Sequence, residues 1–352
     1  MECFHDRVVL GVACKVHQSS DPLLRLVHDH EVAGKGAFLY KAAKRAAERL
    51  GLNFSDEAGG LVQLEPSRLK AVVKCAEQQV LLQQHEGKAL HGVFYKHIEE
   101  QGLSRELTFS FLKSAGLKSE TEGFILACQD GVINTLVYRS SVMNVDVPNT
   151  NCRVCQKSPE TLMHILSACS VHAVAGYIHR HNAALRVLYY HLRHSYGIDR
   201  SPILPYAPGD IESVVENERC RIYWNYSFPT TRLLTATKPD IVLFDLVHKA
   251  IYVIEFSAPA ESNIAKKEED KRTKYKDLLE ELRKLHRGYS VKMVVLVIGV
   301  LGGMRPTLLS NLNSIPACEG SSRSLAGRMQ KAVVLGSLRL LRTNNDWVTE
   351  LA

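Results

Sequence analysis

The sequence predicts an α+β protein of more than one domain, with a helical N-terminal region, a small cysteine-rich module and a mixed sheet flanked by helices. Three observations favour this class. Apolar residues recur at helical spacing through residues 1–145, cysteine and histidine cluster in residues 150–172, and short β-branched segments appear in residues 173–345. At 352 residues the chain is longer than one ordinary domain, so each pattern is assigned its own domain.

Composition excludes several classes of protein. Hydrophobic residues form 45% of the chain and charged residues 23%, a balance that permits a folded core and argues against disorder. The longest apolar run, residues 293–301, is about half as long as a membrane span, so no membrane association is expected. The first residues lack the apolar core and cleavage site of a secretory signal, and we therefore expect a protein that is not secreted.

The first 145 residues are expected to be helical. Residues 38–52 are rich in Ala, Lys, Arg and Leu and reach a glycine, a typical helix stop. Pro66 opens a second pattern, in which apolar residues follow the 3.6-residue period to about His85. Residues 103–114 and 120–143 show the same period. No group of catalytic residue types stands out in this region.

Positive charge is concentrated in the second part of the chain. Residues 1–150 hold 17 Lys and Arg against 18 Asp and Glu, whereas residues 151–352 hold 27 against 19. A basic region indicates an anionic partner, of which nucleic acid is the commonest. An ordinary solvated basic surface is the alternative that charge alone leaves open.

Four residues have the identity and spacing of a structural zinc site. Two cysteines stand three residues apart, and a histidine and a third cysteine follow on a short predicted helix, giving the set Cys152, Cys155, His164 and Cys169. Thiolates and imidazole are the preferred zinc ligands, and four of them complete a tetrahedral site with no open position. The alternative is three buried thiols beside an unrelated histidine.

The last third of the chain changes character. Residues 238–246, 249–257 and 291–300 are short β-branched runs that predict strands. A charged helix is expected between the second and third runs, over residues 264–286, and a final helix over 324–342. Strand, strand, helix and strand in this order predict a mixed α/β domain.

Two carboxylates fall in the first two of these strands. If a two-residue turn at His248 and Lys249 joins the strands, Asp240 stands opposite Ser257, and Glu255 is its diagonal neighbour on the same face. Two such carboxylates can converge on one hard divalent cation. A carboxylate in a buried strand is costly unless it is paired or bound to metal, so Glu255 is the strongest single indication of function. The alternative is a strand-end glutamate paired with a lysine.

The charged helix supplies lysines on one face. Lys267, Lys271 and Lys274 are spaced at i, i+4 and i+7. A lysine beside the cation can orient or deprotonate a water and stabilise negative charge on phosphorus. Together with Asp240, Glu255 and magnesium or manganese, Lys271 or Lys274 would suit phosphodiester hydrolysis.

These residues carry a resemblance to a known family. The order of its motifs is the Cys-Cys-His-Cys group, Arg180-His181-Asn182, Lys238-Pro239-Asp240, Glu255, and Lys271 or Lys274-Tyr275. This order resembles the C-terminal region of non-LTR retrotransposon polyproteins, which carries a zinc knuckle and a restriction-like PD-(D/E)xK endonuclease. Residues 120–142, 294–303 and 329–342 also look like segments of those polyproteins. The resemblance is clear over residues 100–345.

The resemblance implies a fold, a function and partners. It implies a linker region over 1–145, a zinc knuckle over 150–172 and a restriction-endonuclease-like domain over 173–345. It further implies nicking of a target DNA, with element RNA as another partner, in the nucleus or the nucleocytoplasm.

The resemblance also assigns roles to single residues. Asp240 and Glu255 would be ligands of magnesium or manganese, and Lys271 or Lys274 would be the catalytic lysine. Four residues would contact nucleic acid: Arg180, His181, Asn182 and Lys238. For the Arg180-His181-Asn182 motif, capping or packing of the helix is an equal alternative.

Three departures from the family pattern bear on this expectation. The acidic residue lacks a lysine two positions later, because Glu255 is followed by Phe256 and Ser257. Asn225 follows Trp224, where many relatives have an acidic residue. The chain has no Asp-Asp pair and so lacks the polymerase signature, which implies a fragment of an element or a gene derived from one. An inert nucleic-acid-binding protein that keeps the knuckle and the nuclease fold is the alternative function, and the oligomeric state is open.

Overall fold

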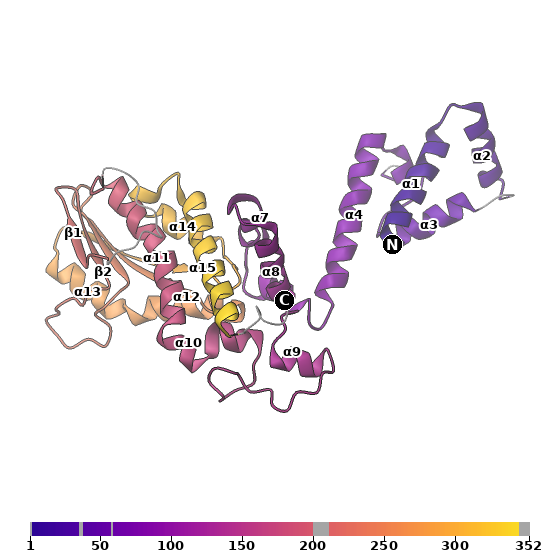
Figure 1. Ribbon diagram of the computed structural model, residues 1–352. Coiled ribbons are helices and arrows are strands. Elements are labelled where there is room, and N and C mark those ends of the chain that lie inside the picture. The colour runs from indigo at the N-terminus through magenta and orange to yellow at the C-terminus, as the bar shows by residue number, and fades with distance from the viewer. Residues whose placement is uncertain (1, 35–37, 58, 200–210, 345–352) are drawn as a thin grey trace. The chain divides into compact units, whose positions relative to one another are not determined.

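The chain folds into two compact units, Met1–Gly92 and Val93–Ala352. The computed structural model describes residues 2–34, 38–57, 59–199 and 211–344 (Figure 1). A helical N-terminal region, a Cys-Cys-His-Cys cluster and a mixed five-stranded sheet flanked by helices follow one another along the chain, so the predicted fold class is confirmed. The subdivision into domains at 145 and 172 stays a prediction. In packing terms, the helices after Gly92 belong to the larger unit.

The smaller unit is built from helices alone. Its helices are α1 (Glu2–Gln18), α2 (Pro22–Val32), α3 (Leu39–Arg49) and α4 (Pro66–Glu86), with a short 3-10 turn at Leu61–Gln63 before α4. Buried alanines of α3 (Ala43, Ala46 and Ala47) pack against Leu10 and Ala13 of α1. Small side chains on both helices permit this close approach. The predicted helices at 38–52 and after Pro66 are therefore present.

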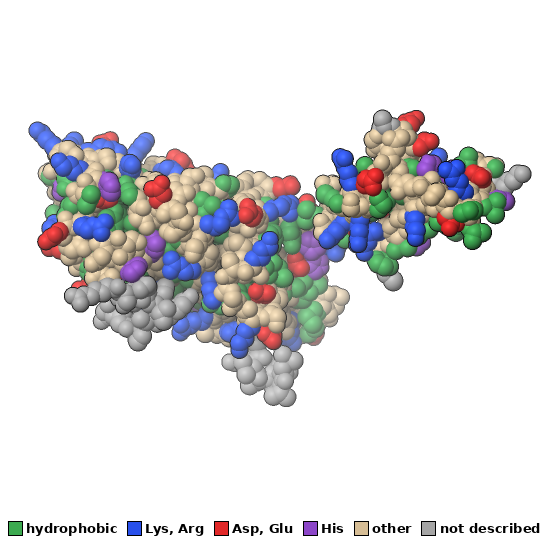
Figure 2. All heavy atoms as spheres, turned by 90° about the horizontal axis from the view of Figure 1, so that it is seen from above, with side chains coloured by type: hydrophobic (Ala, Val, Ile, Leu, Met, Phe, Trp, Pro, Cys, Tyr) green, Lys and Arg blue, Asp and Glu red, His purple; other side chains and the backbone are tan. Residues whose placement is uncertain are grey.

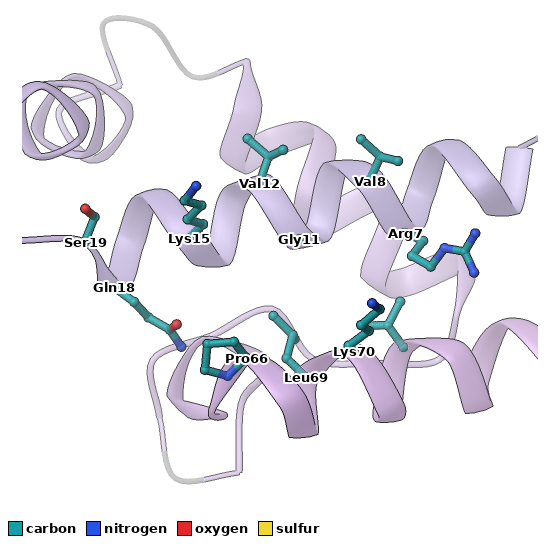
Figure 3. A pocket seen from close by; sticks show the side chains of 11 residues that line it. Arg7, Val8, Gly11, Val12, Lys15, Gln18, Ser19, Pro66, Leu69 and Lys70 are labelled. Atoms are coloured by element: carbon teal, nitrogen blue, oxygen red, sulfur yellow. The ribbon is translucent and has the colours of Figure 1, made fainter. Parts of the chain in front are cut away.

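A groove lies between α1 and α4 of the smaller unit (Figure 3). It encloses about 700 Å³, and apolar side chains such as Val8, Val12 and Leu69 form most of its lining. Lys15 and Lys70 lie at its edges. None of the catalytic or metal-binding candidates lines this groove, so it is separate from the site described below.

Short helices begin the larger unit. They are α5 (Val93–Glu100), α6 (Arg105–Thr108), α7 (Phe111–Ser114), α8 (Ser119–Gln129) and α9 (Leu136–Ser141). The helices expected over 103–114 and 120–143 are thus each split in two. The second split falls where Gly131 adopts a positive φ of 71°, a conformation that ends a helix and that glycine accepts without strain.

A mixed sheet forms the centre of the larger unit. Its strands are β1 (Val214–Glu216), β2 (Cys220–Trp224), β3 (Ile241–Asp245), β4 (Ala250–Ser257) and β5 (Ser290–Val297), in the spatial order β1-β2-β3-β4-β5. Neighbouring strands are antiparallel except β4 and β5, which are parallel and joined by a helical crossover. The three predicted strands are β3, β4 and β5, and β1 and β2 extend the sheet beyond them.

Helices cover both faces of this sheet (Figure 1). The remaining helices are α10 (Ser170–Val174), α11 (Gly176–Ser195), α12 (Ile264–Lys274), α13 (Lys276–Leu285), α14 (Thr307–Asn313) and α15 (Ser322–Asn344). Side chains of α11, α14 and α15 share one core with the face of β4 that carries Tyr252, Ile254 and Phe256. Side chains of α13 pack on the opposite face, against Val253. The helix predicted over 264–286 is interrupted at Tyr275, which lies between α12 and α13.

Among the described residues, no helix is both long enough and apolar enough to cross a bilayer.

Candidate functional site

The four predicted zinc ligands come together in the folded chain. One ligand atom from each of Cys152, Cys155, His164 and Cys169 lies within 4.8 Å of the other three. Sγ of Cys155 and Nε2 of His164 are 3.3 Å apart. All four side chains are largely buried. Three sulfurs and one imidazole at this separation form a group that can hold a structural zinc ion.

Local hydrogen bonds shape the loop that carries the first two cysteines. The amide of Cys152 donates to the carbonyl of Ser158 (2.8 Å), which closes a tight turn around the pair. The carboxylate of Glu160 is fully buried and accepts hydrogen bonds from the amides of Arg153 and Leu136 and from the Arg153 guanidinium. Glu160 therefore links the turn that carries Cys152 and Cys155 to the start of α9 by hydrogen bonds.

A second set of bonds holds the other two ligands. His164 begins a single π-helical turn (His164–Ala168), and Cys169 follows it. The hydroxyl of Tyr177 accepts from the amide of Cys169 (2.9 Å) and donates to the carbonyl of Ile165 (2.9 Å). The short helix that the sequence predicts is present in π form, which turns His164 and Cys169 toward the two cysteines.

The two candidate carboxylates lie on one face of the sheet. Ile241 of β3 is paired with Ile254 of β4, and this register puts Asp240 opposite Glu255. The amide of Asp240 donates to Oε1 of Glu255 (3.1 Å). The amide of Phe256 donates in turn to Oδ2 of Asp240 (2.8 Å).

The predicted register was wrong by two residues. The turn between β3 and β4 has four residues, Leu246–Lys249, rather than two, so Asp240 is not opposite Ser257. Asp245 accounts for the longer turn, because its carboxylate accepts from the amide of His248 (2.9 Å). A shift of two residues keeps each side chain on the same face of the sheet, so Asp240 and Glu255 share a face as expected.

The two candidate lysines have different partners. Nζ of Lys271 lies 2.5 Å from Oε2 of Glu255. Nζ of Lys274 lies 3.0 Å from the hydroxyl of Tyr275, which donates to the carbonyl of Lys238 (2.9 Å). Lys267 is paired with Asp270 along its own helix, away from the carboxylates. Lys271 therefore contacts a candidate ligand directly, and Lys274 reaches the loop before Asp240 only through Tyr275.

The surroundings push the pKa values of the two carboxyl groups in opposite directions. Burial, followed by the charge of Asp240, raises the pKa of Glu255 despite the nearby ammonium of Lys271. Burial also opposes ionisation of Asp240, but the hydrogen bond from His181 and the charges of His181 and Lys271 lower its pKa. Crowded carboxylates with divergent pKa values are typical of functional sites.

The residues of the Arg180-His181-Asn182 motif lie in different environments. The side chain of Arg180 is 2% exposed, donates to Oγ of Ser337 (3.2 Å) and lies over the ring of Tyr177. This burial favours the packing role for Arg180 over contact with phosphate. His181 instead reaches the carboxylate site, where its Nε2 lies 3.2 Å from Oδ2 of Asp240. Asn182 is half-buried, with Oδ1 3.1 Å from Nδ1 of His181.

Sequence reasoning missed two features of this site. It did not connect His181 with Asp240, because the two residues are 59 positions apart in the sequence and only the fold brings them into hydrogen-bond contact. It also gave no role to Tyr275, whose buried hydroxyl fixes the loop of Lys238. A role for Tyr275 could have been suspected from the sequence, because a tyrosine between two charged helical segments is an isolated apolar residue.

Charge on the surface is mixed. On the face drawn in Figure 2, Lys and Arg side chains of the larger unit are interspersed with Asp and Glu. Lys238, next to the carboxylates, is exposed, as are Lys274 and Arg272 of α12. Lys238 precedes the candidate ligand Asp240 by two residues, and Arg272 and Lys274 precede Tyr275 at the end of α12.

Comparison with protein-family models gives no match for this chain, and comparison with curated proteins gives none either. The family resemblance therefore rests on the order of the motifs in the sequence.

Proposed function

We propose that this chain is a metal-dependent DNA endonuclease module, derived from a non-LTR retrotransposon. The observation that carries the proposal is the contact of Asp240, Glu255 and Lys271 at one end of the β3–β4 pair. Two acidic residues opposite each other on neighbouring strands, one of them paired with a lysine, match the residue types that the PD-(D/E)xK resemblance requires. The mixed sheet with helices on both faces is compatible with such a nuclease.

The donor set fits a hard divalent cation. Asp240 and Glu255 offer carboxylate oxygens, the ligands that magnesium and manganese prefer. The raised pKa of Glu255 reflects burial and the charge of Asp240, and a bound cation would stabilise the ionised carboxylate against both effects. When bound, it would supply Lewis-acid activation of the phosphodiester and of the attacking water.

The residues of the chain have separate tasks in this proposal. Asp240 and Glu255 hold the cation. Lys271 donates its N–H groups to Glu255 and can stabilise negative charge that develops on phosphorus. Tyr275 fixes the carbonyl of Lys238 and so the entry of the chain into Asp240. Lys238, which is exposed, is available to a phosphate of the DNA backbone.

The resemblance also suggests the role of the cysteine cluster. We infer a structural zinc held by Cys152, Cys155, His164 and Cys169, because all four positions of a tetrahedral site are then filled by protein. In the family such a knuckle helps to bind DNA or RNA. A target DNA and element RNA are thus the proposed partners, in a nuclear or nucleocytoplasmic setting.

A second function has one specific observation in its favour. The ammonium of Lys271 is already paired with Glu255, and Asp240 is hydrogen-bonded by Phe256 and His181, so both carboxylates have partners within the protein. This arrangement would also suit an inert nuclease fold that only binds nucleic acid.

Plasmid nicking separates the two functions. The zinc-loaded full chain is incubated with supercoiled plasmid and magnesium or manganese, beside Asp240→Asn and the exposed control Asp277→Asn. The endonuclease proposal expects open-circular DNA with the wild type and the control and none with Asp240→Asn. Unchanged plasmid with all three proteins, together with retained DNA binding, would support the inert fold instead.

A further inference from the structure

His181 of α11 lies against the two strands that carry the carboxylates. Its Nε2 atom is 3.2 Å from Oδ2 of Asp240 and 3.3 Å from the carbonyl oxygen of Phe256. Its ring packs on the ring of Phe256, with 5.4 Å between the centroids. The side chain is 27% exposed, so these contacts are made in a largely water-excluded setting.

The partners of His181 determine the direction of its hydrogen bonds. A carboxylate oxygen and a backbone carbonyl can only accept, so Nε2 carries the proton and donates to them. The same oxygen of Asp240 also accepts from the amide of Phe256 (2.8 Å). Oδ2 is thus fixed by two donors, whereas no hydrogen bond within the described ranges of the chain reaches Oδ1.

This asymmetry has a consequence for the carboxylate. Two donors on one oxygen restrict the rotation of the carboxylate about its Cβ–Cγ bond and leave Oδ1 as the oxygen without a protein donor among the described residues. A ligand whose orientation is fixed in this way loses less entropy when it binds a cation. Hydrogen bonds to ligating carboxylates are a general means of orienting metal ligands.

We propose that His181 is a positioning residue, which holds the carboxylate of Asp240 in the orientation that binds the divalent cation. The inference rests on the cation site of the proposed function. It replaces the phosphate contact that the sequence suggested for His181, because both ring nitrogens already face partners within the protein: Nε2 faces Asp240 and Phe256, and Nδ1 faces Asn182.

The test measures cation affinity without DNA. Manganese is titrated calorimetrically into the zinc-loaded full chain, into Asp240→Asn as the reference for loss of the site, and into two substitutions of His181. His181→Phe keeps the ring and removes the donor, whereas His181→Gln keeps a donor near the position of Nε2. His191→Phe is the matched control, because His191 lies on the same helix and its Nε2 is 2.9 Å from the carbonyl oxygen of Ala317, away from the carboxylates.

The expected result is a graded one. His181→Phe should lower the manganese affinity about 10- to 100-fold, the usual effect of removing a partner of a metal ligand. His181→Gln and His191→Phe should remain close to the wild type. Equal affinity of His181→Phe and the wild type would overturn the proposal, and so would an equal loss in His181→Phe and His181→Gln, since a donor would then be irrelevant. A phosphate contact would instead leave manganese affinity unchanged and flatten the salt dependence of DNA binding in His181→Phe.

The same titration separates this inference from the proposed function. Manganese binding that depends on Asp240 and on His181, in a protein that does not nick plasmid, would support the inference and overturn the nuclease. If the protein nicks plasmid and His181→Phe leaves the manganese affinity unchanged, the nuclease is supported and the inference about His181 is overturned. Absence of any Asp240-dependent manganese binding in the wild type would overturn both.

Discussion

The ammonium of Lys271 lies 2.5 Å from Oε2 of Glu255, so a helix side chain supplies the cation that the strand itself lacks. Glu255 is followed on β4 by Phe256 and Ser257, and no lysine stands two residues after it. Helix α12 follows β4 and returns along the sheet, which brings Lys271 back over the carboxylate. In the proposed function, Lys271 would take the place of the lysine that the PD-(D/E)xK pattern puts two residues after the acid.

Lys271 and Lys274 should differ in their effect on nicking. Lys271→Ala removes the contact with Glu255, and we expect the nicking rate to fall about 100-fold or more, as when one charge-stabilising donor is removed from an active site. Lys274→Ala removes only a contact with Tyr275 and should have a smaller effect. Rates of plasmid nicking at saturating magnesium measure both. Equal losses would contradict the assignment of Lys271, provided that thermal melting shows both variants folded.

The cysteine cluster should bind one zinc ion per chain. Cys169→Ser removes a thiolate ligand, so native mass spectrometry should detect about one zinc in the wild type and none, or a weakly held ion, in the variant. Chelation should increase hydrogen exchange over residues 150–172, because ligand binding supplies much of the local folding free energy. Cys75→Ser is the control, since Cys75 is an exposed free thiol. A wild-type protein grown with zinc that carries no metal would refute this site.

DNA binding should depend on salt and on Lys238. Lys238 is exposed beside Asp240, and Lys238→Gln should weaken binding to any DNA sequence and reduce the slope of log K against log salt by about one. Lys249→Gln is the matched control, since Lys249 is exposed at the opposite end of the same strand pair. Fluorescence anisotropy over a salt series measures the slopes. A flat dependence in the wild type would argue against nucleic acid as the partner.

The ionisation of Asp245 should make the free energy of unfolding depend on pH. Its buried carboxylate accepts from the hydroxyl of Tyr196 (2.7 Å) and from the amide of His248 (2.9 Å). Burial opposes ionisation, but these bonds outweigh it and lower the pKa of Asp245. A lowered native pKa stabilises the fold above the unfolded value of about 3.9, and this contribution disappears as the pH falls through the native pKa.

Asp245→Asn tests this linkage. At pH 7 it should reduce the free energy of unfolding by about 1.5–3 kcal/mol, the range for hydrogen bonds to a charged group. The difference from the wild type should shrink as the pH falls below about 4. Urea denaturation over a pH series measures it, with the exposed Asp277→Asn as the control. A difference that does not vary with pH would mean that Asp245 is not ionised in the native state.

Local patterns predicted most of the elements. The β-branched runs became β3, β4 and β5, and the Ala-rich segment became α3, because these patterns reflect which side chains one element can bury. The zinc candidates could also be named from sequence, since two cysteines three residues apart and a nearby histidine and cysteine meet within one short loop and turn. Proximity along the chain was sufficient in these cases.

The candidate nuclease site required tertiary structure. The length of the β3–β4 turn depends on the side chain of Asp245, which the sequence does not distinguish from any other turn aspartate, and the predicted register was therefore two residues off. The choice between Lys271 and Lys274 depends on how α12 packs against β5, beside the strand that carries Glu255, and the two lysines are less than one helical turn apart.

The sequence alone determined which residue types are available: three thiols with an imidazole, two strand carboxylates and a lysine-bearing helix. Tertiary structure decided their partners. It buried Arg180 beneath α15 and brought its neighbour His181 to Asp240, because consecutive residues on a helix point about 100° apart. Adjacent residues of one motif thus lie in different environments. Only the packing of α11 against the sheet determines which of them reaches the carboxylates.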